Sequence, residues 1–297
     1  MHICQCNHLT SLTILFPFHM DKETEHDQVL SVISVIGCAV SMISLALVLA
    51  TFVLFPKWRK TLGNKILFNL SAALFLLLAS FLSAAQLTHD PRRCKMNAVA
   101  THYFLLVSFA WMFVEAVYQY LVYVRVFGAR SYITRFMWKA VPLTWGLSFI
   151  PVLSLVIYDS ELYLNNSRYC WMAPVAFYPT VLVPVSIILL ANLVLYFVIF
   201  KNAICVKNTV RSNISDSVRF WSQLRMALCV FFLLGLGWTF AFLSIGDARI
   251  VFSYLFCIFT SLQGFVIFVF FVLRGRESQH LWSAFLTLCR GTGTRRS

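Results

Sequence analysis

Residues 28–55 have the sequence QVLSVISVIGCAVSMISLALVLATFVLF, which contains no charged side chain. A helix of about 20 apolar residues is long enough to cross the roughly 30 Å of hydrocarbon in a bilayer. The whole chain is 60% hydrophobic and 12% charged, whereas an average soluble domain is roughly 25% charged. A single soluble core cannot enclose this much apolar surface, so the stretch predicts a membrane-spanning helix.

Six further apolar stretches predict an all-α membrane protein, a seven-transmembrane helix bundle. Pro151, Pro179 and Pro184 fall inside predicted spans, where neighbouring helices can pair with the carbonyls that a proline frees. The membrane domain is expected to cover residues 28–273, preceded by residues 1–27 and followed by a cytoplasmic segment, residues 274–297. The predicted spans are residues 28–55, 64–87, 96–126, 137–158, 174–200, 223–246 and 249–273.

The distribution of basic residues predicts an extracellular N-terminus and a cytoplasmic C-terminus. In this orientation 18 of the 24 Lys and Arg residues lie on the cytoplasmic side, as is typical of membrane proteins. The net charge of +13 therefore indicates topology and not nucleic-acid binding. Because the chain opens without a signal peptide, we expect it to be the C-terminal portion of a longer secretory-pathway protein. The 18 residues are Lys57, Arg59, Lys60, Lys65, Arg125, Arg130, Arg135, Lys139, Lys201, Lys207, Arg211, Arg219, Arg225, Arg274, Arg276, Arg290, Arg295 and Arg296.

Cys94 and Cys170 both fall on the oxidising side of the membrane in this topology. Cys94 precedes the third span and Cys170 ends the second outer loop. A disulfide between them would hold that loop across the mouth of the bundle and, in the chain-entropy model, stabilise the fold by about 4 kcal/mol. The alternative is two free thiols. The same loop carries a glycosylation sequon at Asn165, whereas the sequon at Asn213 would face the cytoplasm and stay unmodified.

Glu115 is the only carboxylate deep inside a predicted span. Because a charge at the bilayer centre costs roughly 2.5–3.5 kcal/mol, we expect Glu115 to face the bundle interior, to be protonated or to lie near an interface. It would serve either as a polar lock or relay, or as a hydrogen-bonded structural acid. Farther along, residues 276–289 alternate polar and apolar side chains at helical spacing, which predicts a short amphipathic helix on the inner membrane surface.

Enzymatic and transport functions find little support in the sequence. The seven histidines are scattered, with no pair at metal-ligand spacing, and we expect no metal or other cofactor. A secondary transporter is usually built from internal repeats, and seven spans divide poorly into two matching halves. We therefore do not interpret the chain as an enzyme or a transporter.

Several strings, taken together and in order, resemble the adhesion-type G protein-coupled receptors over essentially the whole chain. The third span contains such a string between His102 and Glu115, and Cys170-Trp171 is similar to the signature of the family's second outer loop. The chain departs from the family pattern in Tyr118-Gln119-Tyr120 and in Ser148, which stands where a proline is usual. The other strings are Leu236-Gly237-Trp238-Thr239-Phe240-Ala241-Phe242 and Ser261-Leu262-Gln263-Gly264-Phe265-Val266-Ile267-Phe268.

The resemblance assigns residues 1–27 to the end of an autoproteolysis site and a tethered agonist. In the family, His8 would take the proton of the Thr10 hydroxyl, which attacks the carbonyl of Leu9 to form an ester that water cleaves. The freed strand then acts as agonist, with Leu12, Leu15 and Phe16 inserted between the spans. The alternative is an ordinary β-strand with an apolar face.

The resemblance also implies an agonist pocket and a coupling face. Trp171 would cap the pocket, and Tyr120 and Arg125 would face the G protein. The chain would then be a plasma-membrane receptor whose partners are a heterotrimeric G protein, the extracellular fragment and its own N-terminal segment. The alternative is an adhesion or scaffold subunit whose bundle only anchors an ectodomain. The remaining pocket residues are Phe109, Trp111, Trp238, Phe240 and Gln263.

Self-cleavage requires a strained turn, which the family's preceding domain provides. We therefore predict that the 297-residue chain by itself does not cleave between Leu9 and Thr10. N-terminal sequencing of the purified chain should find an intact peptide bond, and a new N-terminus at Thr10 would contradict the prediction.

Overall fold

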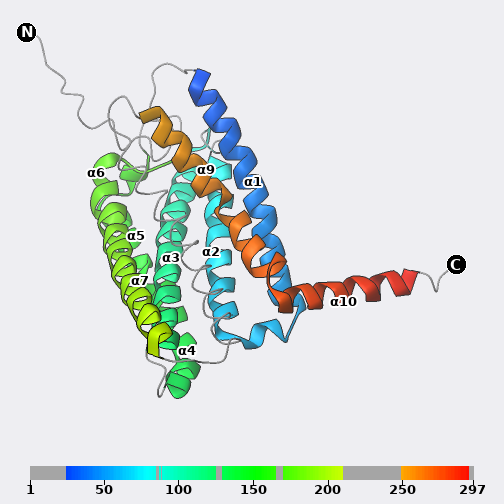
Figure 1. Ribbon diagram of the computed structural model, residues 1–297. Coiled ribbons are helices and arrows are strands. Elements are labelled where there is room, and N and C mark those ends of the chain that lie inside the picture. The colour runs from blue at the N-terminus through cyan, green and yellow to red at the C-terminus, as the bar shows by residue number, and fades with distance from the viewer. Residues whose placement is uncertain are drawn as a thin grey trace, which may run out of the picture.

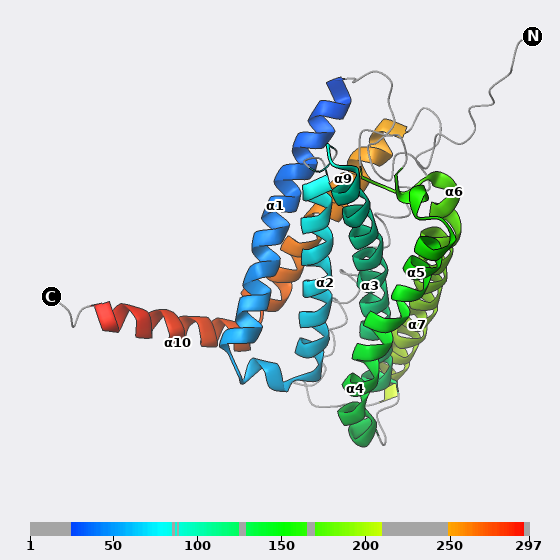
Figure 2. The same ribbon diagram turned by 180° about the vertical axis from the view of Figure 1, so that it is seen from behind.

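The structure, a computed structural model, describes residues 25–84, 87, 89–124, 129–164, 170–209 and 249–293. These residues form helices and connecting loops, and none of them lies in a strand. The long helices stand side by side along one axis, and α10 leaves this bundle at one end (Figures 1 and 2). The all-α helical bundle predicted from the sequence is confirmed. The predicted span at residues 223–246 lies outside the described residues.

Five helices among the described residues are long and apolar enough to cross a membrane, and they coincide with the first five predicted spans. Joining Ile258–Leu273 to Glu277–Phe285 across a bend of 80° adds a sixth candidate. The elements are α1 (Glu25–Leu54), η2 (Trp58–Lys60), α2 (Leu62–Ala84), α3 (Pro91–Tyr123), α4 (Ala129–Leu147), α5 (Phe149–Tyr158), η3 (Ser160–Tyr163), α6 (Pro174–Phe177), η4 (Tyr178–Leu182), α7 (Val183–Thr209), α9 (Arg249–Phe268), η6 (Val269–Leu273) and α10 (Arg276–Gly293).

Prolines interrupt two of the spans that the sequence analysis treats as continuous. The fourth span divides into α4 and α5 at Ser148, because Pro151 has no N–H to donate to the carbonyl of Leu147. The fifth span comprises α6, the π-helical segment η4 and α7. Within it, Pro184 cannot donate to the carbonyl of Thr180, four residues earlier. That carbonyl is consequently available to a neighbouring element.

Helices α1 and α9 pack closely through small residues. The hydroxyl of Ser41 on α1 donates to the carbonyl of Ser261 and accepts from the N–H of Phe265 at 3.4 Å. An uninterrupted helix pairs that amide with that carbonyl, so the Ser41 hydroxyl bridges two groups of the α9 backbone. Gly264 lies beside this bridge, where a Cβ would come within 2.8 Å of the Ser41 carbonyl oxygen. The approach of the two helices therefore depends on glycine at this position.

Helix α10 packs against the last turns of α1. The indole N–H of Trp282 donates to the Thr51 hydroxyl at 3.1 Å, and the ring of Phe55 meets the ring of Trp282 edge-on at 5.4 Å. The predicted amphipathic helix at residues 276–289 is thus present, within the longer α10.

We predict that Gly264→Ala destabilises the bundle, because the new methyl group would collide with the backbone of α1. Overpacking of this kind typically costs about 1–3 kcal/mol. Gly146→Ala is the matched control, since a Cβ at Gly146 on α4 meets nothing within 4 Å. Thermal unfolding of the two purified variants should show a lower midpoint for Gly264→Ala alone. Equal midpoints would contradict this account of the packing.

Candidate functional site

The candidate site lies at the end of the bundle that carries the Cys94–Cys170 disulfide, which we call the disulfide end. The opposite end, where α10 leaves, is the α10 end (Figure 1). At the disulfide end, α3 begins at Pro91 after Asp90, whose carboxylate accepts the N–H of Arg92 at 3.0 Å. Aspartate before a first-turn proline is a favoured helix start, because it pairs an amide that the helix leaves unpaired.

The disulfide joins the first turn of α3 to the loop that leads into α6. The Cα atoms of Cys94 and Cys170 lie 4.9 Å apart, and both cysteines are buried beside Ala84. The predicted pairing is therefore present. It holds the far end of the loop between α5 and α6 against the core of the bundle.

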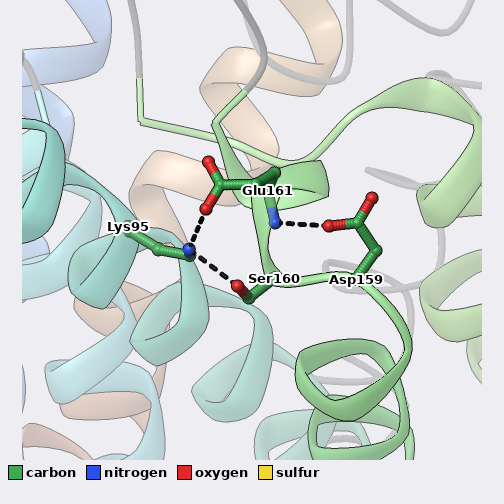
Figure 3. A network of polar contacts seen from close by, with 4 residues as sticks. All are labelled: Lys95, Asp159, Ser160 and Glu161. Carbon is green, nitrogen blue, oxygen red and sulfur yellow. Dashed lines mark hydrogen bonds and ion pairs between the residues drawn. The ribbon is translucent and has the colours of Figure 1, made fainter.

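An ion pair holds the near end of the same loop (Figure 3). The ammonium group of Lys95 on α3 contacts the carboxylate of Glu161 and the hydroxyl of Ser160, both at 2.8 Å. Asp159 supports this arrangement by accepting the N–H of Glu161 at 2.8 Å. Because the Glu161 carboxylate is largely exposed, water and salt weaken the pair, and it orients the loop more than it stabilises the fold.

His102 is buried at the disulfide end and follows Lys95 on α3 by seven residues, about two helical turns. Its Nε2 lies 3.2 Å from the carbonyl oxygen of Thr180, the carbonyl that Pro184 frees. A carbonyl oxygen only accepts, so Nε2 carries the proton and donates. In the neutral imidazole Nδ1 then accepts, and the Tyr163 hydroxyl donates to it at 2.9 Å. We call these three residues the His102 junction; it joins α3, η3 and η4.

The loop between α5 and α6 closes over the apolar interior next to this junction. The N–H of Ala173 donates to the carbonyl of Leu162 at 2.7 Å, which brings the two ends of the loop together. Trp171 is 9% exposed and Met172 is 2% exposed, and both belong to the main buried cluster of the bundle. The described part of the loop therefore buries large apolar side chains at this end of the bundle.

The structure places four of the predicted pocket residues in the interior. Phe109, Trp111 and Trp171 share the main buried cluster, and Gln263 is buried on α9. Among the described residues, neither the indole N–H of Trp111 nor the amide Nε2 of Gln263 has a hydrogen-bond acceptor. The other predicted site residues lie outside the described residues: His8, Leu9, Thr10, Leu12, Leu15, Phe16, Trp238, Phe240, Asn165 and Arg125.

At the α10 end, polar groups of α3 face the interior. Gln119 donates to the carboxylate of Glu115 at 3.1 Å, within one turn of α3. This contact fits the alternative that Glu115 is a hydrogen-bonded structural acid. Tyr120 packs beside the small buried cluster that contains Tyr196 of α7. Tyr118 lies against α2, because its ring is 3.4 Å from the position of a Cβ at Gly63.

Sequence reasoning assigned no role to His102, Tyr163 or Thr180. A histidine within an apolar span needs partners for both ring nitrogens, and Pro184 leaves a carbonyl unpaired four residues earlier. Those two facts were visible in the sequence. Their conjunction was not, because helix packing decides which freed carbonyl meets which donor.

With five, or up to six, candidate membrane spans among the described residues, the fold is that of a multi-pass helical membrane protein. Residues 27–267 match the family model described as 7 transmembrane receptor (Secretin family). The chain belongs to the adhesion G protein-coupled receptors of that family, which are multi-pass receptors of the plasma membrane.

Three relatives illustrate the similarity. The chain is 36% identical to adhesion G-protein coupled receptor G6 of Danio rerio over 96% of this chain and 25% of the relative. It is 37% identical to receptor G4 of Homo sapiens over 97% of this chain and 9% of the relative. It is 34% identical to receptor G2 of Mus musculus over 96% of this chain and 29% of the relative. The chain thus spans less than a third of the length of each relative.

We predict that His102→Leu destabilises the disulfide end. It leaves the Thr180 carbonyl and the Tyr163 hydroxyl buried without their partner, at a cost of about 1–3 kcal/mol each. His89→Leu is the control, because His89 lies in an exposed turn at the same end. Thermal unfolding should show a midpoint several degrees lower for His102→Leu only. An unchanged midpoint would show that the junction contributes nothing to stability.

Proposed function

We propose that this receptor carries an extracellular event to a heterotrimeric G protein and is activated by its own N-terminal segment, residues 10–16. In this proposal the disulfide end faces the outside and the α10 end faces the cytoplasm. Family membership supports the proposed signalling to a G protein. The surplus of basic residues in the predicted cytoplasmic loops supports the proposed orientation.

Two observations carry the proposal: large apolar side chains are buried at the disulfide end, and the interior farther along the bundle contains unpaired donors. An inserted strand needs apolar surroundings for Leu12, Leu15 and Phe16, and the buried rings of Phe109 and Trp171 supply such surroundings. Burial of each large side chain favours insertion by about 1.5–3 kcal/mol.

An inserted strand also brings backbone carbonyls, and each must find a donor away from water. Within the described part of the chain, Trp111 and Gln263 each hold one buried side-chain nitrogen that donates to no acceptor. A buried donor without a partner costs about 1–3 kcal/mol, so a strand carbonyl at either position would gain affinity. We assign Trp171 to the cap of the agonist pocket, and Trp238, Phe240 and Gln263 to its floor.

Activation requires that the segment bind one arrangement of the helices better than another. The interrupted fourth and fifth spans offer places where such arrangements differ, because their backbone ladders are already broken by proline. At the α10 end, Tyr120 and Arg125 would then contact the G protein. Tyr118 packs on Gly63 of α2, and this contact would change if α3 moved relative to α2.

We also propose that the segment becomes free by self-cleavage between Leu9 and Thr10, with His8 as general base, when an upstream domain frames the turn. Asn165 is proposed to carry an oligosaccharide on the outer loop. Neither modification changes the chemistry of the membrane domain. Both modifications would require the disulfide end to face the outside of the cell.

The test is a second-messenger assay in cells that display the receptor with Thr10 as its first residue. We expect high signalling, and we expect Leu12→Ala and Leu15→Ala to reduce it roughly tenfold or more, since each removes most of a buried side chain. Thr13→Ser is the control, because it keeps the hydroxyl and should leave signalling unchanged. All variants are compared at equal surface expression.

Flat signalling that no substitution changes would favour the alternative of an adhesion or scaffold subunit. Signalling that is high but insensitive to Leu12→Ala and Leu15→Ala would exclude the tethered segment as the agonist.

A further inference from the structure

The turn between α1 and α2 concentrates positive charge at the α10 end. Lys57, Arg59 and Lys60, which we call the basic turn, lie within four consecutive positions, and all three side chains are exposed. The ion pairs that the structure describes join Arg93 to Asp90 and Lys95 to Glu161, at the disulfide end. Within the described residues, the three cations of the basic turn therefore have no carboxylate partner.

The backbone of the basic turn is held in place by its neighbours. Trp58 lies between the cations in sequence but points into the core, where it is 3% exposed. Its N–H donates to the carbonyl of Phe55 at 3.0 Å, and its carbonyl accepts from the amide of Asn64 at 2.9 Å. A set of cations on a fixed backbone loses less entropy when it binds a ligand than one on a free loop.

Apolar side chains that face outward place the basic turn at the edge of the hydrocarbon layer. Val53 is 63% exposed and Leu54 is 46% exposed at the end of α1, so the lipid-facing surface of this helix ends three residues before Lys57. A cation that follows a lipid-facing surface this closely lies at the level of the phospholipid headgroups.

Helix α10 lies beside the basic turn. The chain bends by 80° between Leu273 and Glu277, so α10 starts beside the α1–α2 connection and projects outward from the end of the bundle (Figures 1 and 2). Phe55, two residues before Lys57, contacts both Trp282 and Phe285 of α10, at ring-centroid distances of 5.4 and 6.2 Å. Phe285 is itself 37% exposed. The basic turn and the exposed ring of Phe285 thus both adjoin Phe55.

We propose that the basic turn and α10 form a binding site for an anionic phospholipid. The basic turn would contact the phosphate and the negative headgroup, and the exposed apolar side chains of α1 and α10 would contact the acyl chains. A soluble anion or an acidic peptide would use the cations but not this lipid-facing apolar surface. Glu277, the exposed carboxylate in the first turn of α10, leaves the cations in excess. The proposal is independent of the tethered segment and of G-protein coupling.

The test measures lipid retention by the full chain in nanodiscs of phosphatidylcholine with a minor share of phosphatidylserine, followed by native mass spectrometry. We compare Lys57→Gln/Lys60→Gln with Arg92→Gln/Arg93→Gln, which removes two exposed charges at the disulfide end. Since each basic residue near a membrane surface contributes about a fivefold preference for anionic lipid, the first variant should retain phosphatidylserine roughly 25-fold less than the unmodified chain. The control should retain it within about twofold.

A second measurement does not depend on any variant. Phosphatidylserine retention by the unmodified chain should fall as salt rises from about 0.1 M to about 1 M, because the Debye length shrinks from about 10 Å to about 3 Å.

Equal losses of phosphatidylserine in the two variants would overturn the proposal. Salt-independent retention or full competition by soluble glycerophosphoserine would also overturn it. The same holds if the Lys57→Gln/Lys60→Gln variant retains phosphatidylserine and loses only G-protein binding.

Discussion

A helix in lipid has no water with which to pair its backbone, so a carbonyl freed by proline must find a donor inside the protein. Pro184 frees the carbonyl of Thr180, and His102 of α3 supplies the donor at 3.2 Å. The second ring nitrogen of His102 then accepts from Tyr163, which lies at the start of the loop between α5 and α6. One unpaired carbonyl thereby couples the fifth span, the third span and the covering loop.

This coupling gives the disulfide end its character. The loop is held at its far end by the disulfide, at its near end by Lys95, and at its base by the His102 junction. With its ends fixed, Trp171 and Met172 are buried over the interior. The proline breaks and the buried loop residues are compatible with the proposed activation by a tethered segment, since such a ligand would need a shielded apolar site and helices that can adopt more than one arrangement.

The sequence predicted the parts of the structure that depend on composition. Apolar length located five spans, the topology suggested the Cys94–Cys170 pair, and helical spacing indicated the amphipathic helix after Arg276. It did not predict contacts that depend on packing. Gly146 and Gly264 look alike in sequence, yet a Cβ is harmless at the first and would collide with α1 at the second. The bridge from Ser41 into α9 likewise joins residues more than 200 positions apart.

The central claim is that residues 10–16 bind inside the disulfide end. It is tested most directly by cryo-electron microscopy of the receptor that begins at Thr10, bound to a G protein. The account predicts continuous density for the segment between the helices, with Leu12 and Phe16 beneath Trp171 and a strand carbonyl facing the N–H of Trp111 or Gln263. A segment that extends away from the bundle while the G protein is bound would contradict it.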